Sequence, residues 1–268
     1  MKKITIFVIL LIILGAVFGF FYFEKNNKGA AVDPFLDKIK QSGKLVVGVD
    51  FSYGVMEFFD ENKNPVGIDI DIIKEIARRL GLEVDIKSYS WDELLAATKN
   101  GEIDLAISSI TITAPRSKEM LFSAPYFNGG QVVIVKTDNS GISRLADLTN
   151  KKIGAQKDTT SYDEAIKLTA QDLIITYASW DNSDLSGGII SDLKEGKTEA
   201  VIVDYIQAIS SVKDNPTLKI VGEPFTQEYY GLASKLDNTA LIEEVNTILR
   251  DLKREGLLEN IKNKWIKL

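Results

Sequence analysis

The stretch "SSITITAPR", which ends at Arg116, places a cation where a helix would ordinarily favour an acid. If Thr113 caps a helix and Pro115 lies in its first turn, Arg116 falls at the positive end of the helix dipole. An anion held between free helix N–H groups and the guanidinium would make that position favourable, with Ser109 and Thr111 as hydroxyl donors. The stretch thus predicts a carboxylate site, and a tolerated surface arginine fits the local pattern equally well.

A weak internal repeat links this stretch to a second polar residue. "LLAATKNGEIDLAISS" and "IISDLKEGKTEAVIVD" both read as helix, glycine and hydrophobic strand, and eight residues after each glycine stand Ser109 and Asp204. The Asp204 carboxylate would suit an ammonium group, although capping a helix is the commoner use of such an aspartate. Two similar units suggest two α/β lobes that face one cleft, but any two helix-glycine-strand units could look alike.

Other candidates have competing structural explanations. Asp50, after the strand-like "KLVVGV", could bind a ligand or act as a turn aspartate. Tyr53 and Trp91 could sandwich a ligand or stack on a cation, although such aromatics are more often core. The hydroxyls of "QKDTTS" could be a second set of donors to the anion, but Ser161 and Glu164 have the spacing of a capping box.

The elements that must position these residues follow from hydrophobic periodicity. The last 30 residues, with an amphipathic helix behind Asn238, are expected to return to the first lobe. Alternating strands and helices predict parallel pairing, with ligands bound beyond the carboxyl ends of the strands. The pattern predicts strands at 44–49, 83–88 and 104–109, helices at 71–80 (ended by Gly81) and 91–100 (capped by Ser90 and Glu93, ended by Gly101), and strand-like connections between lobes at 129–136 and 218–225.

Composition narrows the chemistry. The chain has 268 residues, a formal net charge of −6, no cysteine and no histidine. The net negative charge argues against a basic surface that would bind nucleic acid. Without cysteine and histidine, the chain can form no disulfide or thiolate metal site and has no imidazole to act as a general base. The sequence also carries no glycine-rich phosphate loop, metal-binding cluster or nucleophile elbow. We therefore expect no cofactor and no metal.

The N-terminus carries a membrane signal. Lys2 and Lys3 precede the apolar run "ITIFVILLIILGAVFGFFYF", residues 4–23, which is about long enough to cross a bilayer. A cleaved signal peptide and an uncleaved anchor both fit, and the length of the run together with its terminal aromatics favours the anchor. The lysines predict that the following residues lie outside the cytoplasm.

Eight segments together resemble a known family. They are "GKLVVGVD", "PVGIDIDIIKEIARRLG", "SWDELLAATKNGEIDLAISSITITAPR", "FSAPYF", "GQVVIVK", "LADLTNKKIGAQKDTTS", "EAVIVD" and "LKREGLLENIKNKW". In order and spacing, the chain from about residue 43 onward resembles the extracellular amino-acid-binding proteins of ABC importers, solute-binding family 3. The resemblance implies an α/β fold of two lobes joined by two connecting strands, the type II periplasmic-binding-protein fold, here preceded by a hydrophobic helix. It also implies a monomer that closes on one free amino acid, docks on a membrane permease and does no covalent chemistry.

The resemblance assigns roles to individual residues. It gives the α-carboxylate to Arg116, helped by Thr111, the backbone near Ser109, and Thr160 of the other lobe, and it gives the α-ammonium to Asp204. Tyr53 and Trp91 match positions that flank the ligand side chain, while Asp50 and Gln156 match positions that reach its distal end. Asp50, joined by Glu57 if the two lie close together, would attract a basic or amide group and repel a carboxylate. Arginine, lysine, glutamine and histidine are therefore the candidate ligands.

Some features depart from the family pattern. Gly54-Val55-Met56 replaces a stretch that usually contains proline, and Asp158 replaces the glycine before the paired threonines. The lipobox cysteine is absent, so only the 4–23 segment could tether the chain. Two alternatives stay open, which are a cyclohexadienyl or arogenate dehydratase on the same fold, with Asp50 or Glu57 as the acid, and an amino-acid sensor module.

The expected organisation follows from these observations. Residues 1–23 form a signal peptide or anchor, and residues 24–42 form a tether. Residues 43–130 and 222–268 form the first lobe, and residues 131–221 form the second. The folded part is expected outside the cytoplasm, at the cell surface or in a periplasm.

Overall fold

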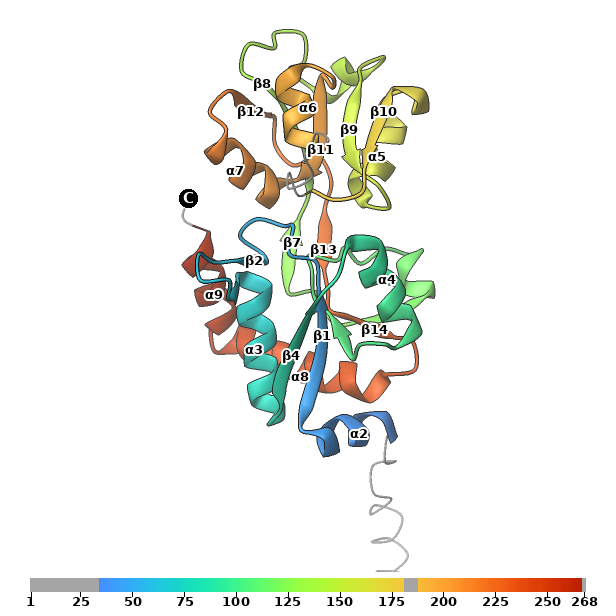
Figure 1. Cartoon of the computed structure of the whole chain (residues 1–268), viewed down its shortest axis with the longest axis vertical. Coiled ribbons are helices and arrows are strands. Elements are labelled where there is room, and N and C mark those ends of the chain that lie inside the picture. The colour runs from blue at the N-terminus through green and yellow to red at the C-terminus, as the bar shows by residue number, and fades with distance from the viewer. Residues whose placement is uncertain (1–33, 181–187, 267–268) are drawn as a thin grey trace, which may run out of the picture.

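The computed structural model describes residues 34–180 and 188–266, which fold into two α/β lobes, one above the other, joined by a pair of strands (Figure 1). The predicted membrane segment, residues 4–23, lies outside the described residues. Among the helices that are described, none combines the length and the apolar character needed to span a bilayer.

The first lobe is built on a mixed five-stranded sheet in the order β4-β1-β5-β14-β6. β1 runs parallel to β4 and β5, and β14 runs antiparallel to β5 and β6. A small hairpin, β2–β3, stands apart from this sheet. The strands are β1 (Lys44–Val49), β2 (Phe58–Phe59), β3 (Pro65–Val66), β4 (Glu83–Ser88), β5 (Leu105–Ala106), β6 (Met120–Phe122) and β14 (Ala233–Lys235).

The helices of the first lobe begin and end largely where the sequence predicts. Gly81 and Gly101 end their helices in the left-handed conformation, and the box of Ser90 and Glu93 is present. Asn238 precedes its helix but makes no side-chain capping bond; its amide donates to Ser234 Oγ at 2.7 Å instead. The helices are α2 (Pro34–Ser42), α3 (Ile68–Leu80), α4 (Trp91–Asn100), α8 (Thr239–Arg254) and α9 (Leu257–Trp265).

The C-terminal helices return to the first lobe, as predicted. The apolar face of α8 is buried in the core that β1 and α3 also line, and α9 joins the same core. In Figure 1 the red C-terminal helices lie beside the blue and cyan N-terminal elements. The buried side chains of α8 include Leu241, Val245, Ile248, Leu249 and Leu252. This lobe is therefore closed by chain segments that are distant in sequence.

The second lobe has a five-stranded sheet in the order β10-β9-β11-β8-β12. β9 is parallel to β10 and β11, whereas β8 is antiparallel to β11 and β12. Its strands are β8 (Gln131–Lys136), β9 (Ile153–Gln156), β10 (Ile174–Tyr177), β11 (Ala200–Asp204) and β12 (Leu218–Val221), and its helices are α5 (Thr160–Leu168), α6 (Ile189–Glu195) and α7 (Tyr205–Asp214).

Two short antiparallel strands, β7 (Phe127–Gly129) and β13 (Glu228–Tyr230), pass between the lobes (Figure 1). The predicted connections at 129–136 and 218–225 are therefore misplaced by several residues. Strong β-branched runs mark β8 and β12, but both of these strands belong to the second sheet, while the true connections have a less hydrophobic sequence. The prediction of two connecting strands is nevertheless confirmed.

Candidate functional site

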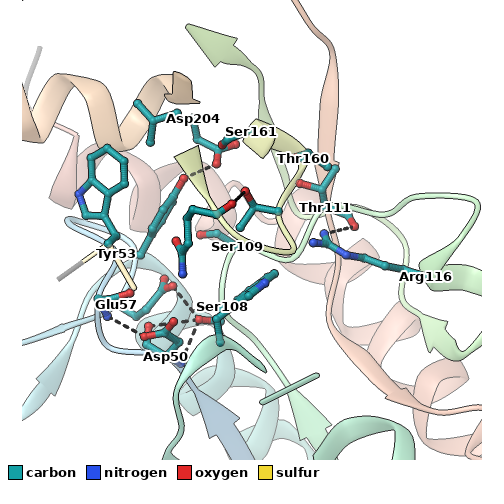
Figure 2. Close-up of a pocket in the computed structure, with 16 residues that line it drawn as sticks. Asp50, Tyr53, Glu57, Ser108, Ser109, Thr111, Arg116, Thr160, Ser161 and Asp204 are labelled. Atoms are coloured by element: carbon teal, nitrogen blue, oxygen red, sulfur yellow. Dashed lines mark hydrogen bonds between the residues drawn. The ribbon is translucent and has the colours of Figure 1, made fainter. Parts of the chain in front are cut away.

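One cavity of about 480 Å³, its mouth included, lies between the lobes (Figure 2). Side chains from both lobes line it, and the size suits a small molecule. All nine residues singled out from the sequence are in its wall: Asp50, Tyr53, Trp91, Ser109, Thr111, Arg116, Gln156, Thr160 and Asp204. Their roles toward a ligand stay predictions, since the cavity shows only that the fold brings them together.

Arg116 reaches the cavity from a shorter element than expected. Residues 116–118 form a single 3-10 turn, not an α-helix, and Thr113 Oγ1 accepts the Arg116 N–H at 3.3 Å. A three-residue turn has almost no dipole, so the expected conflict between cation and helix is absent. The guanidinium is itself the available anion-binding group at this position.

Three contacts hold the Arg116 guanidinium, and one of them crosses the cleft. It donates to Thr111 O at 3.0 Å and to Asp158 O of the second lobe at 3.2 Å, and it lies 5.2 Å above the Trp91 ring. Burial lowers the pKa of Arg116, while Glu228 and other nearby carboxylates raise it. An arginine stays charged at neutral pH despite such a shift. The cation is thus fixed in place and partly dehydrated.

Asp204 sits at the end of β11, in the centre of the second sheet. It precedes α7 but makes no capping bond with its side chain, so the capping explanation fails. Its Oδ2 accepts from Tyr53 OH of the other lobe, and its Oδ1 accepts from Tyr230 OH at 2.5 Å and Gln131 Nε2 at 3.1 Å. Burial raises the pKa of Asp204 to about 6 despite these donors. A cation beside it would stabilise the ionised form.

A group of acids forms another wall of the cavity. Ser108 Oγ donates to Glu57 Oε1 at 2.8 Å, and Asp50 Oδ1 accepts the Ser52 N–H at 3.1 Å (Figure 2). Asp50 therefore fulfils the turn role that the sequence suggested and also borders the cavity. Both carboxyl groups favour a cationic or N–H donor at this end of a ligand.

Glu57 is backed by a second buried acid, Asp69. Asp69 Oδ2 accepts from Ser109 N and Tyr126 OH, each at 2.8 Å, whereas Glu57 Oε2 and Asp69 Oδ1 have no donor within the part of the chain that the structure describes. Burial, reinforced by the adjacent charge of Asp69, raises the pKa of Glu57, and burial raises the pKa of Asp69 to about 7. Two dry carboxylates repel, so the pair is expected to retain a proton.

The chain makes a sharp turn where a strand was predicted. β5 covers only Leu105–Ala106, not the whole of 104–109, and Ser109 has a φ of 50°. This left-handed residue directs its N–H to Asp69 and leaves its buried hydroxyl without a partner among the described residues. Such strain is typical of functional sites. Ser109 Oγ is a free donor at the cavity.

The second lobe contributes the start of α5 and the loop before it. Thr159, not Ser161, caps α5 by accepting the Tyr162 N–H, so the predicted capping box of Ser161 and Glu164 is wrong. Ser161 instead donates to Gln131 Oε1 at 2.8 Å. Asp158 adopts a φ of 58°, the left-handed conformation expected there. The loop thereby places Asp158 O against the first lobe.

The remaining predicted residues lie around these charges. Trp91 Nε1 donates to Asp158 O at 3.0 Å, which adds another bond between the lobes. Gln156 Nε2 donates to Ala178 O at 3.3 Å, so the amide of Gln156 is oriented by the second lobe. Within residues 34–180 and 188–266, no group of three or more acidic side chains is arranged to hold a metal ion.

A comparison with protein families decides the class. The profile described as "Bacterial extracellular solute-binding proteins, family 3" matches residues 45–268. The chain belongs to this family. The resemblance suggested by the eight sequence segments is thereby confirmed, and the fold is similar to that of a mutant of ArgBP from T. maritima, which is 36% identical with a TM-score of 0.78 over 86% of this chain and 98% of its own.

Several characterised proteins are similar to this solute-binding protein. The L-cystine-binding protein TcyJ of Escherichia coli K12 is 30% identical over 240 residues, which cover 89% of this chain and 88% of TcyJ. Structures of an ancestral arginine-binding protein bound to arginine and to glutamine are each 37% identical, with a TM-score of 0.77, and cover 84% of this chain and at least 98% of theirs. The ancestral amino acid-binding protein AncCDT-1, a precursor of cyclohexadienyl dehydratase, is 31% identical with a TM-score of 0.78, over 87% of this chain and 100% of its own.

Sequence reasoning missed three polar residues of this solute-binding protein. Asp69 stands in a helical, amphipathic pattern that suggests an exposed acid, and Ser108 is hidden in a strand-like run. Glu228 belongs to "TQEYYG", which has no motif, yet its side chain is only 5% exposed. The only available signal was the alternation in "QEYY", where Glu228 and Tyr230 share one face of a strand.

Proposed function

We propose that this protein binds one free polar or basic L-amino acid between its lobes and presents it to an ABC permease. Arginine, lysine, glutamine and histidine are the candidates. The observation that carries the proposal is the opposition of two charged groups across one cavity, the half-buried Arg116 from the first lobe and the buried Asp204 from the second. A zwitterion matches this pair, because its carboxylate and its ammonium are covalently linked and opposite in sign.

The acidic end of the cavity supports the choice of side chain. Asp50 and Glu57 lie together away from Arg116 in Figure 2, so a ligand held at its α-carbon would direct its side chain toward them. A guanidinium, ammonium or amide can donate hydrogen bonds there, whereas a ligand carboxylate would be repelled. Relatives that bind arginine and glutamine agree with this preference.

Closure of the lobes supplies the mechanism. Residues 43–130 with 222–268 would form one rigid lobe and residues 131–221 the other, and the strands β7 and β13 would act as the hinge. A ligand that contacts Arg116 on one side and Asp204 on the other gains both contacts only in the closed state. Binding would therefore shift the population toward closure, and the closed form would dock on the permease.

The experiment that tests this function is a thermal-shift screen of the full chain in detergent against the common amino acids and L-cystine. A ligand at 100 times its Kd stabilises a protein by about 2.7 kcal/mol, which raises the melting temperature by a measurable amount. We expect a response to at least one of arginine, lysine, glutamine and histidine, and none to aspartate. A flat response across all amino acids would refute the proposal.

A second candidate is an enzyme of the dehydratase type, which one specific observation favours. Glu57 lines the cavity and its pKa is raised, so it could remain protonated and serve as a general acid. Direct assay of prephenate and arogenate turnover separates this function from binding, and we expect none. A sensor role would share the ligand site and differ only in its membrane partner.

We propose that the 4–23 segment directs the chain across the membrane and tethers it there. Fractionation of cells that express the full chain, followed by protease treatment of intact cells or spheroplasts, tests this placement. An uncleaved anchor predicts full-length protein in the membrane fraction with an accessible folded part. Release of a shorter soluble chain would instead indicate a cleaved signal peptide.

A further inference from the structure

The connecting strand β13 carries a carboxylate that touches both lobes. Glu228 is 5% exposed and lies behind the wall of the cavity, which it does not itself line. Its Oε2 accepts from Thr111 Oγ1 at 2.7 Å and from Thr160 Oγ1 at 2.8 Å, and its Oε1 accepts from Thr226 Oγ1 at 3.2 Å. One carboxylate oxygen thus receives two hydroxyl protons.

The two threonines on that oxygen belong to opposite lobes. Thr111 follows β5 of the first sheet and bridges to Tyr230 of the connecting strand. Thr160 is the first residue of α5, and α5 packs against the second sheet in the core of that lobe. Glu228 therefore links the lobes through a single atom, at the strand about which they would move.

These bonds determine whether each threonine hydroxyl can donate or accept a hydrogen bond toward the cavity. A threonine hydroxyl has one proton, and here each proton is given to Glu228. Thr160 Oγ1 also accepts from Gln131 Nε2 at 3.3 Å, which uses one of its lone pairs. Toward the cavity, Thr111 and Thr160 are thus acceptors in this arrangement, and a carboxylate placed against them would find no donor.

We propose that Glu228 is an internal carboxylate that bridges the lobes and competes with a ligand carboxylate for the protons of Thr111 and Thr160. This inference rests on the proposed function for the position of the ligand carboxylate near Arg116. When a ligand enters, the two hydroxyls rotate from Glu228 to the ligand, and the guanidinium remains the fixed donor. Glu228 is a positioning residue, since it acts through the threonines.

The competition has a consequence for affinity. Each hydroxyl bond to the ligand is gained only as a bond to Glu228 is lost, so the net gain is smaller than for free hydroxyls. Because Glu228 accepts from one threonine of each lobe, its own bonds also favour closure. Less of the binding free energy is then needed to close the lobes than in a protein without such a carboxylate between them.

The first test is calorimetric titration of the full chain, in detergent, with L-arginine as the probe. In Glu228→Gln the amide can donate to the threonine oxygens, which frees the hydroxyl protons for a ligand carboxylate. We expect the Kd for L-arginine to fall about threefold to tenfold, the scale of one hydrogen bond regained. L-arginine amide, which lacks the carboxylate, should show no such gain. The matched control is Glu223→Gln, at an exposed residue of the same segment.

An unchanged or higher Kd for L-arginine in Glu228→Gln, with wild-type binding intact, would overturn the competition while leaving the proposed function standing. An equal gain for L-arginine amide would also overturn it, because the effect would not involve the carboxylate. A merely structural role of Glu228 would change stability without this selectivity.

The second test needs no ligand. The chain has no cysteine, so spin labels at Lys87→Cys on the first lobe and Lys213→Cys on the second report one distance. In the ligand-free full chain, Glu228→Ala should lengthen or broaden the interlobe distance distribution, whereas Glu228→Gln, which can still bridge the threonines, should change it less. Identical distributions in wild type and Glu228→Ala would refute the bridge, whatever the outcome with L-arginine.

Discussion

The two lobes contain matching units that end differently at the cavity. In the first, α4, Gly101 and β5 lead to Ser109; in the second, α6, Gly196 and β11 lead to Asp204. Both glycines are left-handed, with φ of 73° and 78°, and both strands occupy the centre of their sheets. The internal repeat noticed in the sequence therefore corresponds to equivalent structural positions.

The difference lies in how each unit leaves its strand. β5 is only two residues long, and the chain turns at Ser109 toward the buried acid Asp69. β11 keeps five residues and continues directly into α7, so that Asp204 points at Tyr53 of the other lobe. The same helix-glycine-strand unit is thus followed in the first lobe by a turn and then the cation Arg116, and in the second lobe by the carboxylate of Asp204. Opposite charges at one cavity are the result.

The largest loss of ligand affinity is expected when the cation of the first lobe is removed. Arg116→Ala should weaken binding of the identified amino acid by about 2–5 kcal/mol, because the ligand carboxylate would be left without its charged partner in a partly dry cleft. Isothermal titration calorimetry measures the change. Arg254→Ala, at a side chain that is 75% exposed, should bind as wild type does. Nearly unchanged affinity in Arg116→Ala would refute its role.

A smaller loss is expected on the second-lobe side. Asp204→Asn keeps the shape and one acceptor but removes the charge, so affinity should fall by about 1.5–3 kcal/mol. An ammonium pairs with the ionised form, and the pKa of Asp204 is about 6, so wild-type affinity should also decrease as pH falls through this value. Titrations between pH 5 and 8 should show a weaker pH dependence in Asp204→Asn. An equal dependence in both proteins would assign the titration to another group.

The buried acids of the first lobe predict a pH-dependent stability. The pKa of Asp69 is about 7 in the folded protein and near 4 when unfolded, so the folded state binds more protons. Its contribution is fully present below the unfolded value and is lost as pH rises through about 7. Denaturation by urea from pH 5 to 8 should show stability falling with pH, with a smaller slope in Asp69→Asn. Asp204, with its raised pKa, supplies part of the remaining slope in the same direction.

The smallest expected effect is a loss of stability at the two helix-ending glycines, which tests whether the two units are equivalent. Gly101→Ala and Gly196→Ala each force a left-handed alanine and should each cost about 1–2 kcal/mol of stability. A Cβ at Gly101 would lie 2.9 Å from Lys235 Cδ, but the flexible lysine side chain can move away. A Cβ at Gly196 would meet nothing within 4 Å. Urea denaturation should therefore give similar losses. A loss at only one glycine would show that the units differ in their helix ends as well.

The sequence predicted most of the framework. Glycine stops, the capping box of Ser90 and Glu93, and the apolar face of α8 are local signals that depend on neighbours within a few residues, and the structure confirms them. The order and spacing of the eight segments identified the family. The nine cavity residues were found because the family pattern and the strand ends point to the same positions.

Other features depended on contacts between segments that are far apart in sequence. The connecting strands were misplaced because hydrophobicity marks burial and does not reveal which sheet a strand joins. The turn at Ser109 is fixed by Asp69, 40 residues away, and the hydroxyl protons of Thr111 and Thr160 are directed by Glu228, 117 and 68 residues away. Sequence by itself determined the family, the lobes' elements and the charged residues that face each other. Only the tertiary structure decided which hydrogen bonds those residues already make, because a proton's direction depends on partners that meet only when the chain is folded.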